Sequence, residues 1–289
     1  MSFSLLQAEE GDQEPSSSMV RIVCEPTIRY WFGLDSHVYA MAIAANVLLG
    51  FFPFMLLMLT LASFAFPASN ADQAIILGLR AFLPEDVGLV DFVVRNLRAE
   101  VANRGAVPAV SVILLLVAAN GIFMPLEVAQ NRLWRFPVHR NYAFNQMLSL
   151  CMGATSMVMA LLSSLFAAYA GAILFSRFPA TFPTLDMAML WALRMSGALA
   201  TTVVLLLVYW LLPNGRVPFG RALTTAFVVA VLIEGVQFAY AWVWPWLGLR
   251  AEYGPFFISV TLMLWGFLAA MVVLAGAEAC ARRGSAPGA

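Results

Sequence analysis

Two charged side chains lie inside the most apolar part of the sequence, at equal distances from one turn. The turn is Pro213-Asn214-Gly215, and Arg194 and Glu234 lie twenty residues before and after Asn214. A charge in the core of a bilayer costs at least about 2.5–3.5 kcal/mol on insertion scales, so its presence requires a partner or a function. If the flanking segments form an antiparallel helical hairpin, each charge lies about 30 Å of helix from the turn. We therefore expect the two side chains at similar depth, in the outer half of the membrane.

Three roles remain open for these two charges. They can neutralise each other as a buried ion pair that fixes helix packing. Alternatively, Glu234 and Gln237, one helical turn later, line a polar cavity that binds a solute, an ion or a lipid headgroup. In the third case, Arg194 extends to the membrane interface. Our hypothesis is that Glu234 faces the protein interior.

Two asparagines also lie within long apolar stretches. Asn46 and Asn120 are expected to form hydrogen bonds between helices, each worth roughly 0.6 kcal/mol. Near the end of the chain, Glu278 precedes Arg282 by four residues, a spacing that predicts a simple salt bridge on a helix. The candidate substrate-binding or cavity-lining residues are Asn46, Asn120, Arg194, Glu234 and Gln237.

The residue types give little support to catalysis. The chain has two histidines, and its three cysteines are far apart, so neither a His-based triad nor a CxxC metal site is expected. The P-loop pattern GxxxxGK[ST] is absent, so any energy source would be an ion gradient or a partner protein. The net charge is zero, which gives no support to a nucleic-acid binder. We expect no catalytic residue, no metal, no cofactor and no enzymatic activity.

Composition indicates an integral membrane protein. Hydrophobic residues make up 62% of the 289, and charged residues 11%. Soluble domains contain about 45–50% apolar and about 25% charged residues. Several stretches exceed the roughly 20 apolar residues that cross a bilayer as a helix. Lipid offers no partners to backbone amides, so an all-α polytopic fold is expected.

Six spans divide the chain. They are expected at about 37–66, 107–128, 143–175, 187–212, 218–244 and 255–279, within a transmembrane domain over 31–283. The connection 67–106 has apolar residues at helical spacing, which predicts amphipathic helices on the membrane surface; a lid over an outward-facing cavity is the alternative. The acidic segment 1–30 is expected to be a disordered cytoplasmic tail, and 284–289 a second cytoplasmic tail. Pro53 is expected to kink the first span.

Arginines in the short connections predict the orientation. Seven arginines follow the second, fourth and sixth spans, whereas the short connections on the other side hold two. Basic residues accumulate on the cytoplasmic side of membrane proteins. Both termini are therefore expected in the cytoplasm, and 67–106 in the periplasm. The seven are Arg132, Arg135, Arg140, Arg216, Arg221, Arg282 and Arg283.

Several stretches, taken in order, resemble one family. LLPNGRVPFGRALTTAF, then Glu234, AEYGPFF and LAGAEACARR are similar to the C-terminal half of the YihY/virulence factor BrkB family. MAIAANVLLGFFPFMLLMLTL and LEVAQNRLWRFPVHR resemble its first span and the segment after its second. The resemblance covers roughly residues 30–283. Gly50 departs from the family, where a small hydroxyl residue is expected.

The resemblance implies a six-span protein of the bacterial inner membrane, without a settled activity. The family has been labelled ribonuclease BN, and some members are linked to resistance against serum killing. Metal-dependent phosphodiester chemistry needs converging carboxylates or histidines, and only Glu127 lies near a cytoplasmic loop, so nuclease activity is not expected.

A transporter or translocator of a lipid-like amphiphile or a small solute is the leading functional expectation. The alternative is a cell-envelope assembly or structural membrane protein that transports nothing. Membrane lipids are the expected partners and nucleic acid is not. The sequence leaves open whether further copies of the chain or envelope-assembly proteins bind it.

Overall fold

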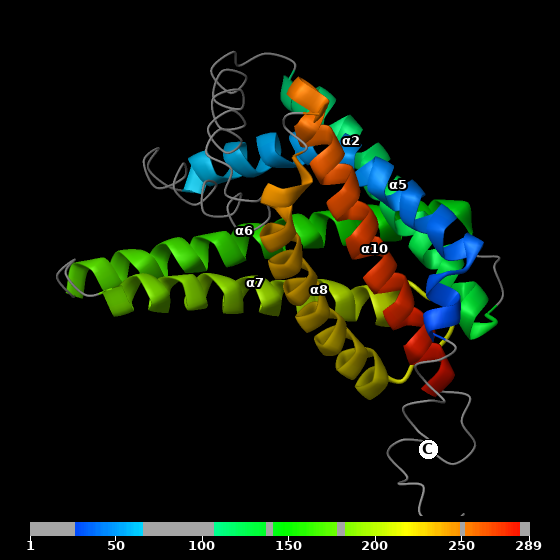
Figure 1. Ribbon diagram of the computed structural model, residues 1–289. Helices are drawn as coiled ribbons and strands as arrows, with labels where there is room; N and C mark the ends of the chain where they lie inside the picture. Colours follow the sequence, from blue (N-terminus) through cyan, green and yellow to red (C-terminus); the bar gives the residue numbers. More distant parts are fainter. Residues whose placement is uncertain (1–26, 66–106, 137–140, 178–182, 249–251, 284–289) are drawn as a thin grey trace, which may run out of the picture.

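The fold is a bundle of long helices. The computed structural model describes residues 27–65, 107–136, 141–177, 183–248 and 252–283, and no strand occurs within these ranges (Figure 1). The expected all-α fold is confirmed. The helices are α2 (Leu34–Ala65), α5 (Val107–Trp134), α6 (Tyr142–Arg177), α7 (Pro183–Leu211), α8 (Phe219–Leu247), the short 3₁₀ helix η1 (Gly254–Phe256) and α10 (Phe257–Arg283).

Six of these helices (α2, α5, α6, α7, α8 and α10) are long and apolar enough to cross a membrane. Their outer faces carry large apolar side chains that the protein leaves uncovered, such as Phe227 on α8, which is 60% exposed, and Leu199 on α7, which is 67% exposed. Such a surface is unfavourable in water but suits lipid. The protein is therefore a multi-pass membrane protein.

Helix α10 is the most buried of the six. Half of its apolar span is buried inside the protein, a larger share than in any other spanning helix. It packs against α2, α5 and α8, and Figure 1 shows it crossing the middle of the bundle. Its buried face contains small residues, including Ala270, Gly276 and Ala277. Small side chains let helices approach closely, which supplies packing energy where no hydrophobic effect drives helix association.

Gly276 marks the closest approach. A Cβ atom at this position would meet Val229 Cγ2 of α8 and would lie 2.7 Å from the Tyr209 hydroxyl oxygen of α7. That hydroxyl donates a hydrogen bond of 2.8 Å to the Val273 carbonyl of α10. Three helices are thus held together at one glycine.

Helices α2 and α5 form a second close pair. A Cβ at Gly50 would lie 2.8 Å from the Ala118 Cβ, so the position where a small hydroxyl residue was expected is a tight contact between the two helices. Pro53, which was expected to kink the first span, lies inside the continuous helix α2, and Pro125 lies inside α5. In Figure 1 the first part of α2 (blue) runs alongside α5, and its last part (cyan) points away from the bundle.

Helices α6 and α7 run side by side and project from the bundle (Figure 1). The Ser163 hydroxyl of α6 donates a hydrogen bond of 3.2 Å to the Ser196 hydroxyl of α7. The other part of α7 packs against α8, which is the hairpin that the sequence predicted around Asn214.

One end of the bundle collects the arginines of the short connections. The ends of α5, α7 and α10 and the beginnings of α2 and α8 meet there (Figure 1), and we call this the arginine end. The backbone amide of Asn214 donates a hydrogen bond of 2.7 Å to the Asn131 side-chain oxygen, which ties the α7–α8 connection to α5. Arginines at this end include Arg29, Arg132, Arg135, Arg216, Arg221 and Arg282.

Two boundaries differ from the sequence predictions. Helix α5 continues to Trp134 rather than ending at Val128. Residues 27–31 are helical, so the expected disorder through residue 30 is wrong for 27–30. The amphipathic helices expected in 67–106, and the remainder of both expected tails, lie outside the described residues.

Gly276→Ala is expected to destabilise the protein by about 1–3 kcal/mol, because overpacking forces neighbouring side chains to move. Gly235→Ala in α8 is the matched control, since nothing lies within 4 Å of its added Cβ and removing a helical glycine is expected to raise stability by about 0.5–1 kcal/mol. The thermal midpoints of the detergent-purified variants measure both effects. Equal midpoints for the two variants would contradict the three-helix contact.

Candidate functional site

The two membrane charges lie together. Arg194 Nη1 of α7 is 3.9 Å from Glu234 Oε2 of α8, and the two side chains are 50% and 27% exposed. The α7–α8 hairpin therefore places the two side chains at a similar distance from the turn, as expected. The distance is at the outer limit of an ion pair, and Arg194 is not enclosed by the protein. The expectation that Glu234 is interior holds only partly, because about a quarter of its side chain is uncovered.

The other three candidate residues are arranged differently. Asn46 was expected to bond across helices, but its amide nitrogen donates to the Ala42 carbonyl of its own helix at 2.8 Å. Its contact with α5 is steric, because its side chain occupies the space beside Gly121. Asn120 and Gln237 are partly buried and make no hydrogen bond within the described part of the chain.

The five candidates form two groups. Asn46 and Asn120 lie on α2 and α5, whereas Arg194, Glu234 and Gln237 lie on α7 and α8. Helix α10 packs against both α2 and α8. Among the residues that the structure describes, no hydrogen bond or ion pair joins the two groups.

A buried polar cluster on α5 was missed. Glu127, Gln130 and Asn131 are 3%, 0% and 1% exposed. The Asn131 amide nitrogen lies 3.4 Å from Glu127 Oε1, while its oxygen accepts the hydrogen bond from Asn214. Neither side-chain atom of Gln130 has a hydrogen-bond partner among the described residues.

The signal for this cluster was present in the sequence. Glu127 and Asn131 are four residues apart and therefore share one helix face. Because the second span was expected to end at Val128, both were assigned to the border of a loop. The longer α5 places them inside the bundle, and Glu127 becomes an ionisable group within a membrane-spanning helix.

A hollow of about 440 Å³ opens at the arginine end. It lies between the beginning of α2, with the residues before it, and the end of α10. Its lining residues are Arg29, Tyr30, Gly33, Leu34, Asp35, Ser36 and Arg282, none of which belongs to the five sequence-predicted candidates. We call it the arginine-end hollow.

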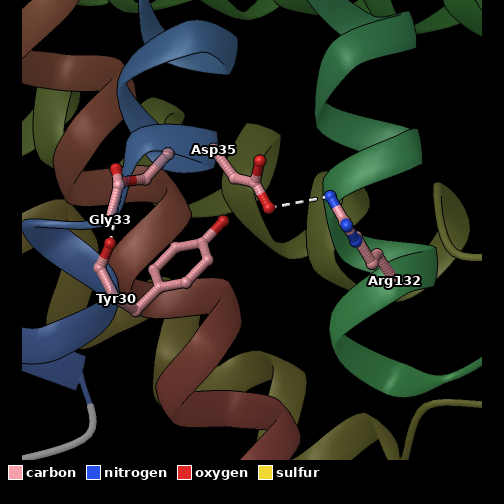
Figure 2. A network of polar contacts seen from close by, with 5 residues as sticks. Tyr30, Gly33, Asp35 and Arg132 are labelled. Atoms are coloured by element: carbon pink, nitrogen blue, oxygen red, sulfur yellow. Dashed lines mark hydrogen bonds and ion pairs between the residues drawn. The ribbon is translucent and has the colours of Figure 1, made fainter.

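Ion pairs and hydrogen bonds shape this hollow. Asp35 Oδ2 accepts a charge-assisted hydrogen bond of 2.8 Å from Arg132 Nη1 of α5 (Figure 2). The Ser36 hydroxyl lies 2.7 Å from both the Tyr30 and the Gly33 carbonyl oxygens, which fixes the turn before α2. Burial raises the pKa of the Tyr30 hydroxyl to about 12, with smaller contributions from Tyr39, Asp35 and Glu278. The phenol therefore remains protonated at neutral pH.

The predicted salt bridge between Glu278 and Arg282 is confirmed. Its setting is more specific than the spacing indicated, because the Glu278 side chain is only 2% exposed. The Thr27 hydroxyl donates a second hydrogen bond to this carboxylate, at 2.5 Å. Within the described ranges, no three His, Cys, Asp or Glu side chains gather in a way that could hold a metal ion.

Asn131→Ala is expected to lower stability by about 1–3 kcal/mol, because the partly buried Asn214 amide loses its acceptor. Asn120→Ala is the matched control: it removes the same side chain from the same helix without removing a hydrogen bond. Chemical or thermal unfolding of the purified variants measures the difference. If the two substitutions cost the same, the Asn131–Asn214 bond does not hold the arginine end together.

Comparison with known families assigns the chain. The family model described as Virulence factor BrkB matches residues 33–285, which includes every spanning helix. No solved structure matches the chain. The chain therefore belongs to the Virulence factor BrkB family.

Proposed function

Starting from this family membership, we propose that the protein is a transporter or translocator of the bacterial inner membrane. Its cargo would be a lipid-like amphiphile or a small solute. The observation that carries this proposal is the Arg194–Glu234 pair, a partly exposed pair of charges on two membrane-spanning helices.

The energetics of the pair support a polar path. A charge facing hydrocarbon costs at least about 2.5–3.5 kcal/mol, so charged residues in membrane helices face a polar interior or a water-filled cavity. An ion pair that fixed packing alone would be most effective when enclosed, yet half of the Arg194 side chain is uncovered. The exposure of Arg194 is explained if water, the cargo or a partner protein covers this side chain during transport.

The buried cluster on α5 gives independent support. The side chains of Glu127 and Gln130 are buried in the protein and lie on a membrane-spanning helix. Ionisable residues at such positions mark ion and substrate pathways. Since the chain has no P-loop pattern, we propose that transport is coupled to an ion gradient or to a partner protein. Glu127 is a carboxylate that could bind a proton or a cation in such a cycle.

A non-transporting role in cell-envelope assembly is the second candidate. The observation that favours it is the separation of the five polar candidates, none of which lines the arginine-end hollow. We propose no enzymatic role and no nucleic-acid partner. The described carboxylates and histidines do not converge as metal-dependent phosphodiester chemistry requires.

Glu234→Gln is expected to lower the transport rate on the order of tenfold, which corresponds to about 1.4 kcal/mol. Protein reconstituted into liposomes is assayed for scrambling of a fluorescent phospholipid and for solute flux. Glu252→Gln, an exposed carboxylate outside the spans, is the matched control and is expected to retain the wild-type rate. If wild-type protein moves neither lipid nor solute, the transport proposal fails and the assembly role gains support.

A charge swap separates packing from transport. The double variant Arg194→Glu with Glu234→Arg keeps an ion pair, so we expect it to recover the thermal midpoint lost in Glu234→Gln. Transport is expected to remain low, because the carboxylate has moved to the other helix. Recovery of both properties would show that the pair only fixes helix packing.

We also propose that the arginine end faces the cytoplasm, with both termini on that side. The proposal follows from the basic residues that gather there. A green fluorescent protein fused to the C-terminus is expected to fluoresce, and alkaline phosphatase fused at the same point is expected to be inactive. An active alkaline phosphatase fusion and a dark green fluorescent protein fusion would show that the arginine end faces the periplasm.

A further inference from the structure

The arginine-end hollow has an excess of positive charge. Its carboxylate, Asp35, is paired with Arg132 at 2.8 Å. The nearby Glu278 is paired with Arg282 and also accepts the Thr27 hydrogen bond. Both described carboxylates are thus neutralised by an arginine.

Arg29 differs from Arg132 and Arg282, because no described carboxylate neutralises its charge. It lines the hollow, is exposed, and makes no ion pair within the part of the chain that the structure describes. A guanidinium presents a planar fork of donors that matches a phosphate group, and it loses less hydration than an ammonium on binding. The hollow therefore suits an anion of this geometry.

The segment that carries Arg29 exposes large apolar side chains, which we call the apolar rim; one of them, Leu34, lines the hollow. Ile28, Phe32 and Leu34, on the same short segment as Arg29, are 57%, 76% and 80% exposed. Three exposed large apolar side chains on one short segment are costly in water but stable against the acyl chains of a lipid.

The hollow also lies at the right depth. The apolar span of α2 begins at Leu34, and that of α10 ends at Arg282; both residues line the hollow. It therefore opens where the hydrocarbon ends and the lipid headgroups begin. A free anion would use the guanidinium but not the apolar rim, so a lipid fits both features.

We propose that the arginine-end hollow binds an anionic phospholipid, with its phosphate on Arg29 and its acyl chains against Phe32 and Leu34. The volume of about 440 Å³ falls within the range of small-molecule sites, about 300–1,000 Å³. The protonated Tyr30 hydroxyl and the Arg282 guanidinium are further donors on the lining. This site does not depend on transport: a lipid bound here is compatible with a transporter or an assembly factor.

The thermal midpoint of the full chain in detergent tests the proposal. A ligand that binds the folded state raises the midpoint, and the shift grows with the logarithm of the ligand concentration relative to its Kd. Phosphatidylglycerol is expected to raise it more than phosphatidylethanolamine does, and inorganic phosphate at the same concentration is expected to leave it unchanged. Arg29→Gln is expected to lose at least about half of the phosphatidylglycerol shift, whereas Arg29→Lys is expected to retain part of it.

Arg216→Gln is the matched control, because Arg216 is an exposed arginine at the same end that does not line the hollow. It is expected to keep the full shift. Phe32→Ser is expected to weaken the response to phosphatidylglycerol without removing a charge, which tests the apolar rim separately.

Three outcomes would overturn the proposal. Equal shifts with the two lipids would remove the preference for an anion. An equal loss in Arg29→Gln and Arg216→Gln would assign the effect to general surface charge. A shift with inorganic phosphate as large as that with phosphatidylglycerol would make the ligand a free anion. None of these outcomes depends on transport, so the proposed function is tested separately.

Discussion

Backbone amides in a bilayer have no partner except one another, and the structure follows from that constraint. The six long helices satisfy their own amides, and their apolar faces remain uncovered by protein because lipid covers them. Association between the helices then depends on close packing and a few polar contacts rather than on the hydrophobic effect. Gly276 shows this directly, because α7, α8 and α10 meet around the space that its missing side chain leaves.

The same constraint makes every polar group inside the spans informative. Asn46 is satisfied by its own helix, and Asn131 by Glu127 and Asn214, so both have a structural explanation. Arg194 and Glu234 are only loosely paired and partly uncovered, and packing alone does not account for them. This contrast is why the proposed function rests on the α7–α8 pair rather than on the asparagines.

Charge is distributed unequally along the bundle. At the arginine end, Asp35 and Glu278 are each matched by an arginine, and the surplus lies on Arg29 and on the α7–α8 connection. A positive end suits an anionic membrane surface, which attracts basic residues by roughly 1 kcal/mol each. Orientation and the lipid proposed for the arginine-end hollow therefore share one electrostatic origin, while the Arg194–Glu234 pair serves a separate role within the spans.

Sequence alone determined the fold class, the six apolar spans, the hairpin around Asn214 and the salt bridge between Glu278 and Arg282. These depend on local composition and on spacing along one or two helices, which the chain displays directly. It did not determine which polar residues meet across the bundle. Asn46 was assigned an interhelical bond that it does not make within the described residues, and the α5 cluster was missed because helix α5 extends about one and two-thirds turns further than expected. The arginine-end hollow joins residues about 250 positions apart, such as Arg29 and Arg282, and only the packing of α10 against α2 brings them together. Hydropathy records how deeply a segment lies in the membrane, but not which face of a helix meets which neighbour; tertiary structure alone decides that.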